Sequence, residues 1–186
     1  MMLMLVTRSD ARLPAIVRAA VDGGVNMVQI RGEADVDSIC AVVGDRARVV
    51  VNSARGRLAG WPGAVPAPLH GIHLTETAPF ANAPFVGRSV HSVDAAVRAE
   101  QEGCDYVVAG SVFPTTSHPN GPIAGVKLIE DVARAVSIPV LAIGGINATN
   151  ARSCIDAGAR GVAVISAIFD AEDPKQAAQE LWRAIA

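Results

Sequence analysis

The chain has 186 residues, of which 16 are basic, 18 are acidic and 51% are hydrophobic, so its formal net charge is −2. This composition supports a packed core and excludes a disordered chain, and the near-neutral charge argues against nucleic acid or an anionic membrane as the main partner. The cysteine count is odd, at three, which argues against a disulfide framework. The apolar start lacks a basic leader, and no apolar run approaches the ~18 residues of a membrane span, so we expect a cytoplasmic protein.

Eight short apolar runs recur along the chain and are predicted to be strands. They cover Leu3–Thr7, Met27–Arg31, Arg48–Asn52, Gly71–Leu74, Val86–Val90, Tyr106–Gly110, Val140–Ile143 and Val162–Ile165. The runs are continuous in hydrophobicity and do not alternate between apolar and polar residues. Such runs are typical of parallel strands that are buried on both faces.

Helical patterns lie between the predicted strands. The clearest are residues 13–21, residues 126–136, a helix from Asn147 to Gly158, and a last helix that begins at Asp173-Pro174. Asn147 is a suitable N-cap, and Gly158 is suited to the end of a helix. Residues 56–83 carry loop signals instead, so we expect the helices in that region to be short or missing.

Three segments share one rhythm, in which a helix-ending glycine is followed by two linker residues and a strand. These glycines are Gly24, Gly103 and Gly158. Repeated units of helix and strand predict a parallel sheet with right-handed crossovers, and eight such units favour a closed barrel. We therefore predict a single, small (β/α)8 TIM barrel over residues 1–186. The alternative is an open, doubly wound sheet.

The carboxyl ends of the last two predicted strands carry the strongest chemical signal. Gly144 and Gly145 directly follow one strand, and the next strand ends at Ile165 and is followed at once by Ser166. Glycine lets backbone N–H groups approach an anion, and the loops after strands seven and eight of a barrel often bind phosphate. We predict a phosphate site here. The alternative is a tight turn without a ligand.

A second signal is the long loop that follows the sixth predicted strand. Thr115 and Ser117 offer hydroxyl groups to a phosphate, and His118 could transfer a proton. Loops at this end of a barrel build the active face. The alternative is a proline-stiffened surface loop with a solvated histidine.

Polar residues also stand at the ends of other predicted strands. They are Gln29, Arg31, Asn52 and Ser89. In a barrel these side chains would reach one cavity, where a small polar substrate would satisfy their hydrogen bonds. Arg31 could instead pair with Glu33. For His73 and His91 the simpler interpretations are an interior histidine and a helix cap.

These motifs, in this order, resemble the thiamine phosphate synthase/TenI family over nearly the whole chain. The most specific segments are residues 28–31, 71–74, 87–92, 105–118, 143–147 and 161–169. The resemblance implies a small TIM barrel that binds a thiazole phosphate as its small-molecule partner. It assigns phosphate binding to Thr115, Ser117, Gly145, Ile165 and Ser166. It assigns the pyrimidine and pyrophosphate side to Gln29, Arg31, Asn52 and Ser89.

The chain departs from the synthase pattern at four charged positions. Glu33 and His118 stand where the synthases carry lysine, and Ser53 and Ala78 stand where they carry metal-binding aspartates. Synthases join a thiazole phosphate to an aminopyrimidine diphosphate with Mg²⁺ on the leaving pyrophosphate, whereas TenI proteins tautomerise a thiazole phosphate without a metal. Since Mg²⁺ commonly takes carboxylate ligands, the departures favour the TenI branch.

We therefore expect a TenI-like thiazole tautomerase, an isomerase that needs neither metal nor cofactor. Its acid–base residues would be His118, whose ordinary pKa suits proton transfer at neutral pH, and then Glu33. Ser111 stands where TenI members can carry a histidine. One alternative is a thiamine phosphate synthase with Mg²⁺, in which Glu76 replaces a missing ligand. A second alternative is a non-catalytic regulatory binder of a phosphate ligand. A homodimer is also plausible.

Overall fold

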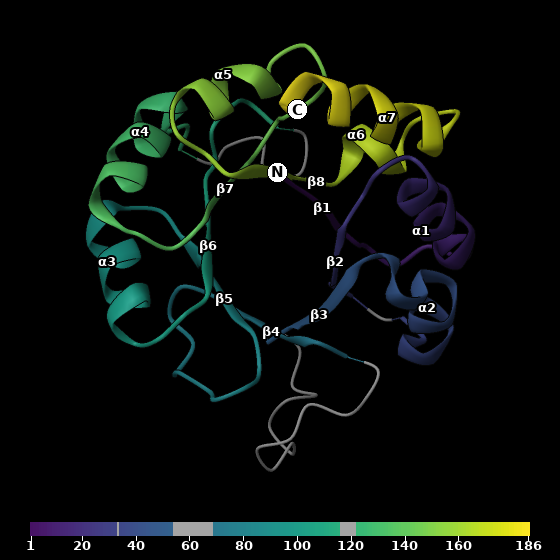
Figure 1. Ribbon diagram of the computed structural model, residues 1–186, viewed down its shortest axis with the longest axis horizontal. Coiled ribbons are helices and arrows are strands. Elements are labelled where there is room, and N and C mark those ends of the chain that lie inside the picture. Colours follow the sequence, from purple (N-terminus) through teal and green to yellow (C-terminus); the bar gives the residue numbers. More distant parts are fainter. Residues whose placement is uncertain (33, 54–68, 116–121) are drawn as a thin grey trace.

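Eight parallel strands close into a barrel in the computed structural model, which describes residues 1–32, 34–53, 69–115 and 122–186 (Figure 1). The strands are β1 Met2–Val6, β2 Met27–Ile30, β3 Arg48–Asn52, β4 Gly71–Leu74, β5 Val86–Val90, β6 Tyr106–Ala109, β7 Val140–Ile143 and β8 Gly161–Val164. Each strand pairs with its neighbours in sequence, and β1 closes the barrel on β8 with Leu3 opposite Val162. The predicted TIM barrel is confirmed, and the open sheet is excluded.

Helices surround the barrel on its outer side (Figure 1). They are α1 Leu13–Asp22, α2 Val36–Val43, α3 Val93–Gln101, α4 Gly125–Ala135, α5 Ala151–Asp156, α6 Ser166–Phe169 and α7 Pro174–Ile185, with a 3₁₀ helix η1 at Gly44–Arg46. Residues 75–85, between β4 and β5, contain no helix, while residues 56–68 of the segment expected to lack long helices lie outside the described residues. None of the helices in the described residues is long and apolar enough to cross a membrane.

The barrel has two layers of core. The outward side chains of the strands pack against the helices, while a smaller cluster fills the barrel interior. That inner cluster consists of Met4, Val6, Met27, Val50, Tyr106, Val108, Leu141 and Ala163. Members that share a strand lie two residues apart, because successive side chains of a strand point to opposite faces. Both faces are therefore buried, which explains the continuous apolar runs.

The starts of two predicted helices have different outcomes. Asp173 caps α7 as expected, because its carboxylate accepts hydrogen bonds from the backbone N–H groups of Lys175 at 2.9 Å and Gln176 at 3.0 Å. The predicted cap at Asn147 is wrong, since α5 begins only at Ala151 with Asn150 at the N-cap position. The side chain of Asn147 instead accepts a hydrogen bond from the Thr149 N–H at 2.9 Å, and this short turn delays the start of the helix.

Candidate active site

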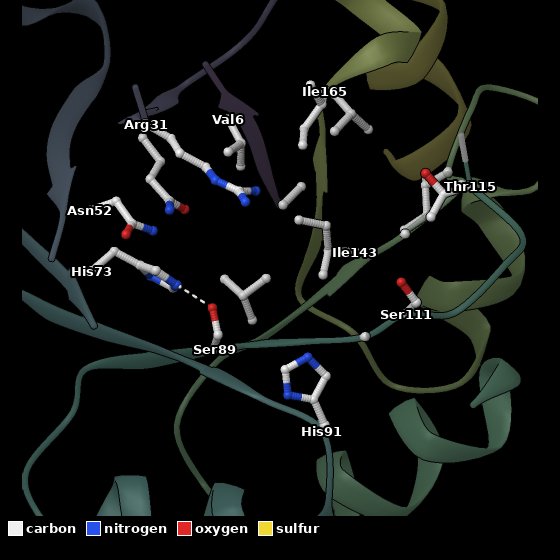
Figure 2. Close-up of a pocket in the computed structure, with 18 of the residues that line it drawn as sticks. Val6, Arg31, Asn52, His73, Ser89, His91, Ser111, Thr115, Ile143 and Ile165 are labelled. Atoms are coloured by element: carbon white, nitrogen blue, oxygen red, sulfur yellow. Dashed lines mark hydrogen bonds between the residues drawn. The ribbon is translucent and has the colours of Figure 1, made fainter. Parts of the chain in front are cut away.

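A cavity of about 350 Å³ opens at the carboxyl ends of the strands. It is lined by residues at or just beyond the ends of all eight strands, because parallel strands in a closed barrel all end at the same rim. Figure 2 shows Arg31, Asn52, His73 and Ser89 on one side of this cavity and Ser111 and Thr115 on the other. The volume is in the range of small-molecule sites.

The first side of the cavity brings together the residues predicted from the ends of β2, β3 and β5. They are Gln29, Arg31, Asn52 and Ser89, and all four line the cavity. The backbone at the end of β2 is fixed by Thr7, whose hydroxyl accepts a hydrogen bond from the Arg31 N–H at 2.9 Å and donates to the Arg31 carbonyl at 3.1 Å. The guanidinium of Arg31 therefore reaches the cavity from a constrained strand end (Figure 2).

His73 on β4 is the interior histidine that the sequence suggested, and it also lines the cavity. Its Nε2 lies 2.9 Å from the Ser89 hydroxyl, and its Nδ1 lies 3.0 Å from the Tyr106 hydroxyl. Burial lowers the pKa of His73 to about 3, and the positive charges of Arg88 and Arg31 act in the same direction. The imidazole is therefore neutral at physiological pH.

The second side of the cavity is built on the turn after β7. Gly144 and Gly145 have φ angles of 108° and 62°, and a Cβ atom on Gly145 would lie 2.2 Å from the carbonyl oxygen of Pro114. Only glycine fits both the backbone conformation and this close approach. The loop after β6 is thereby held against the turn, and it is tied there by a hydrogen bond from the Phe113 N–H to the Gly144 carbonyl at 3.0 Å.

The phosphate-binding residues predicted on this side lie together where the structure describes them. Thr115, Gly145, Ile165 and Ser166 all line the cavity. Among the described residues, the N–H groups of Gly145 and Ser166 have no hydrogen-bond acceptor. Ser117 lies outside the described residues, as do Glu33 and His118.

The rim of the cavity holds a contact between a histidine and a carboxylate that the sequence did not reveal. The Nδ1 atom of His91 contacts the carboxylate of Glu76, and both side chains line the cavity. His91 does not cap α3, because the Ser92 hydroxyl does so by accepting from the Ala95 N–H at 3.2 Å. The Glu76–His91 pair thus belongs to the cavity rim.

Arg88 on β5 organises the turn that carries Glu76. Its buried guanidinium donates from Nη1 to the carbonyl oxygens of Thr75 at 3.1 Å, Glu76 at 3.1 Å and Ala78 at 2.7 Å. Its Nη2 atom contacts the Glu102 carboxylate at 2.7 Å. An arginine in the middle of the short strand Val86–Val90 was the available signal, because a buried charge needs partners.

The donor set at the rim limits how a metal could bind. Glu76 is the one carboxylate among the described residues that line the cavity, and the described part of the chain contains no group of three or more potential His, Cys, Asp or Glu ligands. Ser53 and Ala78, where the resemblance implies metal-binding aspartates, bring no carboxylate. Mg²⁺ usually keeps several waters and takes one or two carboxylates together with substrate phosphates. If Mg²⁺ bound here, Glu76 would be its one carboxylate ligand among the described lining residues, and a phosphate-bearing ligand would have to supply the rest of its coordination.

Comparison with known proteins places the chain in a family. The family described as thiamine monophosphate synthase matches residues 3–168. The chain belongs to this family. The thiamine-phosphate synthase of Methanocella arvoryzae is 37% identical over 194 aligned residues, which cover 90% of this chain and 85% of the relative. The thiamine-phosphate synthase of Thiobacillus denitrificans is 38% identical over 97% of this chain and 91% of its own length. The thiamine-phosphate synthase of Pyrococcus furiosus is 44% identical to this chain over a segment that covers 54% of this chain and 49% of the relative.

Solved structures agree with this assignment. A thiamine phosphate pyrophosphorylase from Pyrococcus furiosus superposes with a TM-score of 0.78 at 31% identity, covering 99% of this chain and 95% of that chain. A 3-hexulose-6-phosphate synthase superposes with a TM-score of 0.69 at 16% identity and covers 100% of both chains, which shows a shared fold alone.

The family recognised from the sequence is confirmed, but the expectation of a TenI-like tautomerase is wrong. Relatives that match almost the whole chain at 37% and 38% identity carry the name thiamine-phosphate synthase, which supports an enzyme of the transferase type. The expectation gave most weight to four charged positions around one subsite. The resemblance had also assigned residues on both sides of the cavity to the synthase pattern, and the acid–base roles given to His118 and Glu33 belonged to the tautomerase interpretation.

Proposed function

We propose that the protein is a thiamine-phosphate synthase, which joins a thiazole phosphate to an aminopyrimidine diphosphate and releases pyrophosphate. One observation carries this proposal. A single cavity presents Arg31 and Asn52 on one side and Thr115 on the other (Figure 2), and Gly145 also lines it. A coupling enzyme needs two such neighbouring subsites, because the bond forms between two separately bound molecules.

The first side of the cavity suits the aminopyrimidine diphosphate. The guanidinium of Arg31 can bind phosphate oxygens through two N–H groups, which gives both charge and orientation. Gln29 and Asn52 offer amide groups to the edge of the pyrimidine ring. As the carbon–oxygen bond to the diphosphate breaks and a carbon–nitrogen bond forms, negative charge grows on the leaving oxygens, and Arg31 stabilises that charge.

Mg²⁺ would be held by Glu76 at the rim and would neutralise negative charge on the diphosphate. The turn that presents Glu76 is fixed by three hydrogen bonds from Arg88. With one carboxylate at this rim, the diphosphate itself must supply most of the affinity for the ion. We therefore expect the enzyme to need a higher Mg²⁺ concentration than a synthase with two aspartates.

The second side of the cavity suits the thiazole phosphate. The N–H groups of Gly145 and Ser166 and the hydroxyl of Thr115 can surround a phosphate group without a charged side chain. Ile143 and Ile165 provide apolar surface beside them for the thiazole ring. The phosphate then fixes the thiazole while its ring faces the aminopyrimidine.

The test is a coupling assay with purified protein, both substrates and Mg²⁺. We expect thiamine phosphate and pyrophosphate in equal amounts, and EDTA should stop their formation. Arg31→Ala should lower the rate by about 100-fold, since a hydrogen bond to a charged group contributes about 1.5–3 kcal/mol. The matched control is Arg152→Ala, an exposed arginine on α5 that should leave the rate unchanged. Binding of both substrates without any product would overturn the proposal.

A further inference from the structure

Three polar side chains form a chain of hydrogen bonds from the barrel interior to the cavity. The Tyr106 hydroxyl lies 3.0 Å from Nδ1 of His73, and Nε2 of His73 lies 2.9 Å from the Ser89 hydroxyl. Tyr106 is fully buried, and His73 is 1% exposed. Figure 2 shows the contact between His73 and Ser89 at the wall of the cavity. Tyr106 therefore reaches the cavity only through the other two residues.

The hydrogen-bond requirements of Tyr106 determine which atom donates and which accepts in each of these hydrogen bonds. Among the described residues, His73 is the one recorded partner of the Tyr106 hydroxyl. Burial raises the pKa of Tyr106, so the hydroxyl keeps its proton. A buried hydroxyl that gives its proton to no acceptor is costly. The hydroxyl must therefore donate to Nδ1, which leaves Nδ1 without a proton.

The tautomer of His73 follows from this donation. A neutral imidazole carries one proton on its two nitrogens, and the pKa of about 3 keeps His73 neutral. With Nδ1 as acceptor, the proton resides on Nε2 and is donated to the Ser89 oxygen. The hydroxyl proton of Ser89 is then free to point into the cavity.

We propose that Tyr106 and His73 are positioning residues that hold the Ser89 hydroxyl as a hydrogen-bond donor toward the bound substrate. The acceptor is an unprotonated atom of the aminopyrimidine diphosphate, since Ser89 lies on the same side of the cavity as Asn52 (Figure 2). Tyr106, His73 and Ser89 thus form a hydrogen-bond relay. Without it, the Ser89 hydroxyl could rotate and present either a lone pair or a proton to the substrate. The identity of this substrate rests on the proposed function.

The first test measures the tautomer itself. In the ligand-free protein labelled with ¹⁵N-histidine, NMR should show a protonated Nε2 and an unprotonated Nδ1 for His73. Tyr106→Phe should produce a mixture of both tautomers, because phenylalanine keeps the ring and its stacking on Phe85, whose centroid is 5.1 Å away, but removes the donor. A proton on Nδ1 of His73 in the unsubstituted protein would overturn the proposal. This measurement needs neither substrate nor activity.

The second test measures coupling between Tyr106 and Ser89 by calorimetry with the aminopyrimidine diphosphate alone. Tyr106→Phe should weaken binding about tenfold while leaving the affinity for thiazole phosphate unchanged. In a Ser89→Ala background the same substitution should have no further effect, because the relay no longer ends at a hydroxyl. In a Ser111→Ala background, across the cavity, the two effects should add.

The outcomes separate this inference from the proposed function. Additive effects of Tyr106→Phe and Ser89→Ala would show a merely structural role for Tyr106 and overturn the relay. A correct tautomer and non-additive binding in a protein that forms no thiamine phosphate would sustain the relay and refute the synthase proposal.

Discussion

A Cβ atom on Gly87 would lie 2.0 Å from the Cζ atom of Tyr106. The tyrosine ring therefore occupies the space that any side chain at position 87 would need, in the middle of the barrel. We predict that Gly87→Ala lowers the free energy of unfolding by about 1–3 kcal/mol, the usual cost of overpacking a core. Denaturant titration measures this change.

A compensating variant makes the steric cause testable. Tyr106→Leu removes the clashing ring atoms, so adding it to Gly87→Ala should cost less than the sum of the two single changes. If the double variant simply adds the two losses, the clash between Gly87 and Tyr106 does not explain the effect.

Gly145→Asp should abolish binding of thiazole phosphate, with an affinity loss of at least about 100-fold. The new carboxylate would repel the phosphate, and its Cβ atom would collide with the Pro114 carbonyl. Calorimetry with thiazole phosphate is the measurement. Gly103→Asp is the control, because Gly103 also has a positive φ but lies outside the cavity lining. Unchanged affinity in Gly145→Asp would place the phosphate elsewhere.

Restoring a carboxylate at position 78 should reduce the need for Mg²⁺. Ala78 lies in the turn held by Arg88, two residues after Glu76, and the family resemblance places a metal-binding aspartate there. We expect Ala78→Asp to lower the Mg²⁺ concentration for half-maximal coupling about tenfold, and Glu76→Gln to raise it. Ala78→Asn serves as the uncharged control. Equal Mg²⁺ requirements in the unsubstituted protein and all three variants would exclude this rim as the metal site.

Stability should fall as the pH drops below 6.5. The pKa of His73 is about 3 in the folded protein, against an ordinary value of 6.5. Between these two pH values the unfolded chain binds a proton on this histidine that the folded protein does not bind. The free energy of unfolding should then decrease by about 1.4 kcal/mol for each pH unit. Above pH 6.5 neither state binds the proton, and the contribution is constant.

The measurement is denaturant unfolding between pH 5 and 7. His73→Gln should remove most of the slope, because glutamine does not titrate. An unchanged slope in His73→Gln would assign the pH dependence to other groups.

The barrel was predictable from the sequence because buried parallel strands appear as continuous apolar runs. The two sides of the cavity were predictable for a related reason, since all strand ends of a barrel meet at one rim, and this places Asn52 and Ser89 on the same side of one cavity. The same continuous runs hide which residues face inward. The contact between Tyr106 and His73 depends on which residues of each strand face inward and on the space left by Gly87. No local sequence pattern therefore indicated this contact.

The branch of the family was not predictable from four charged positions. Glu33 and His118 lie outside the described residues. A charge at an exposed position can change with little effect on the fold, whereas the glycine turn is constrained by packing. Glu76 shows the difficulty, because its place at the rim follows from the hydrogen bonds of Arg88 to the turn. The hydrogen bonds of Arg88 to this turn cannot be predicted from hydrophobic periodicity.

The close approach of Gly145 to the Pro114 carbonyl also determines which amino acids can replace glycine at this position. Every base change in a glycine codon that alters the amino acid adds a Cβ atom, and at this position that atom meets a backbone oxygen that cannot rotate away. Gly125 has a similar φ of 69°, but a Cβ atom there would meet nothing within 4 Å. In a saturation library selected for growth without thiamine, codon 145 should therefore return glycine alone, while codon 125 admits asparagine and aspartate. Selection at codon 145 would then keep the proposed anion site from changing gradually.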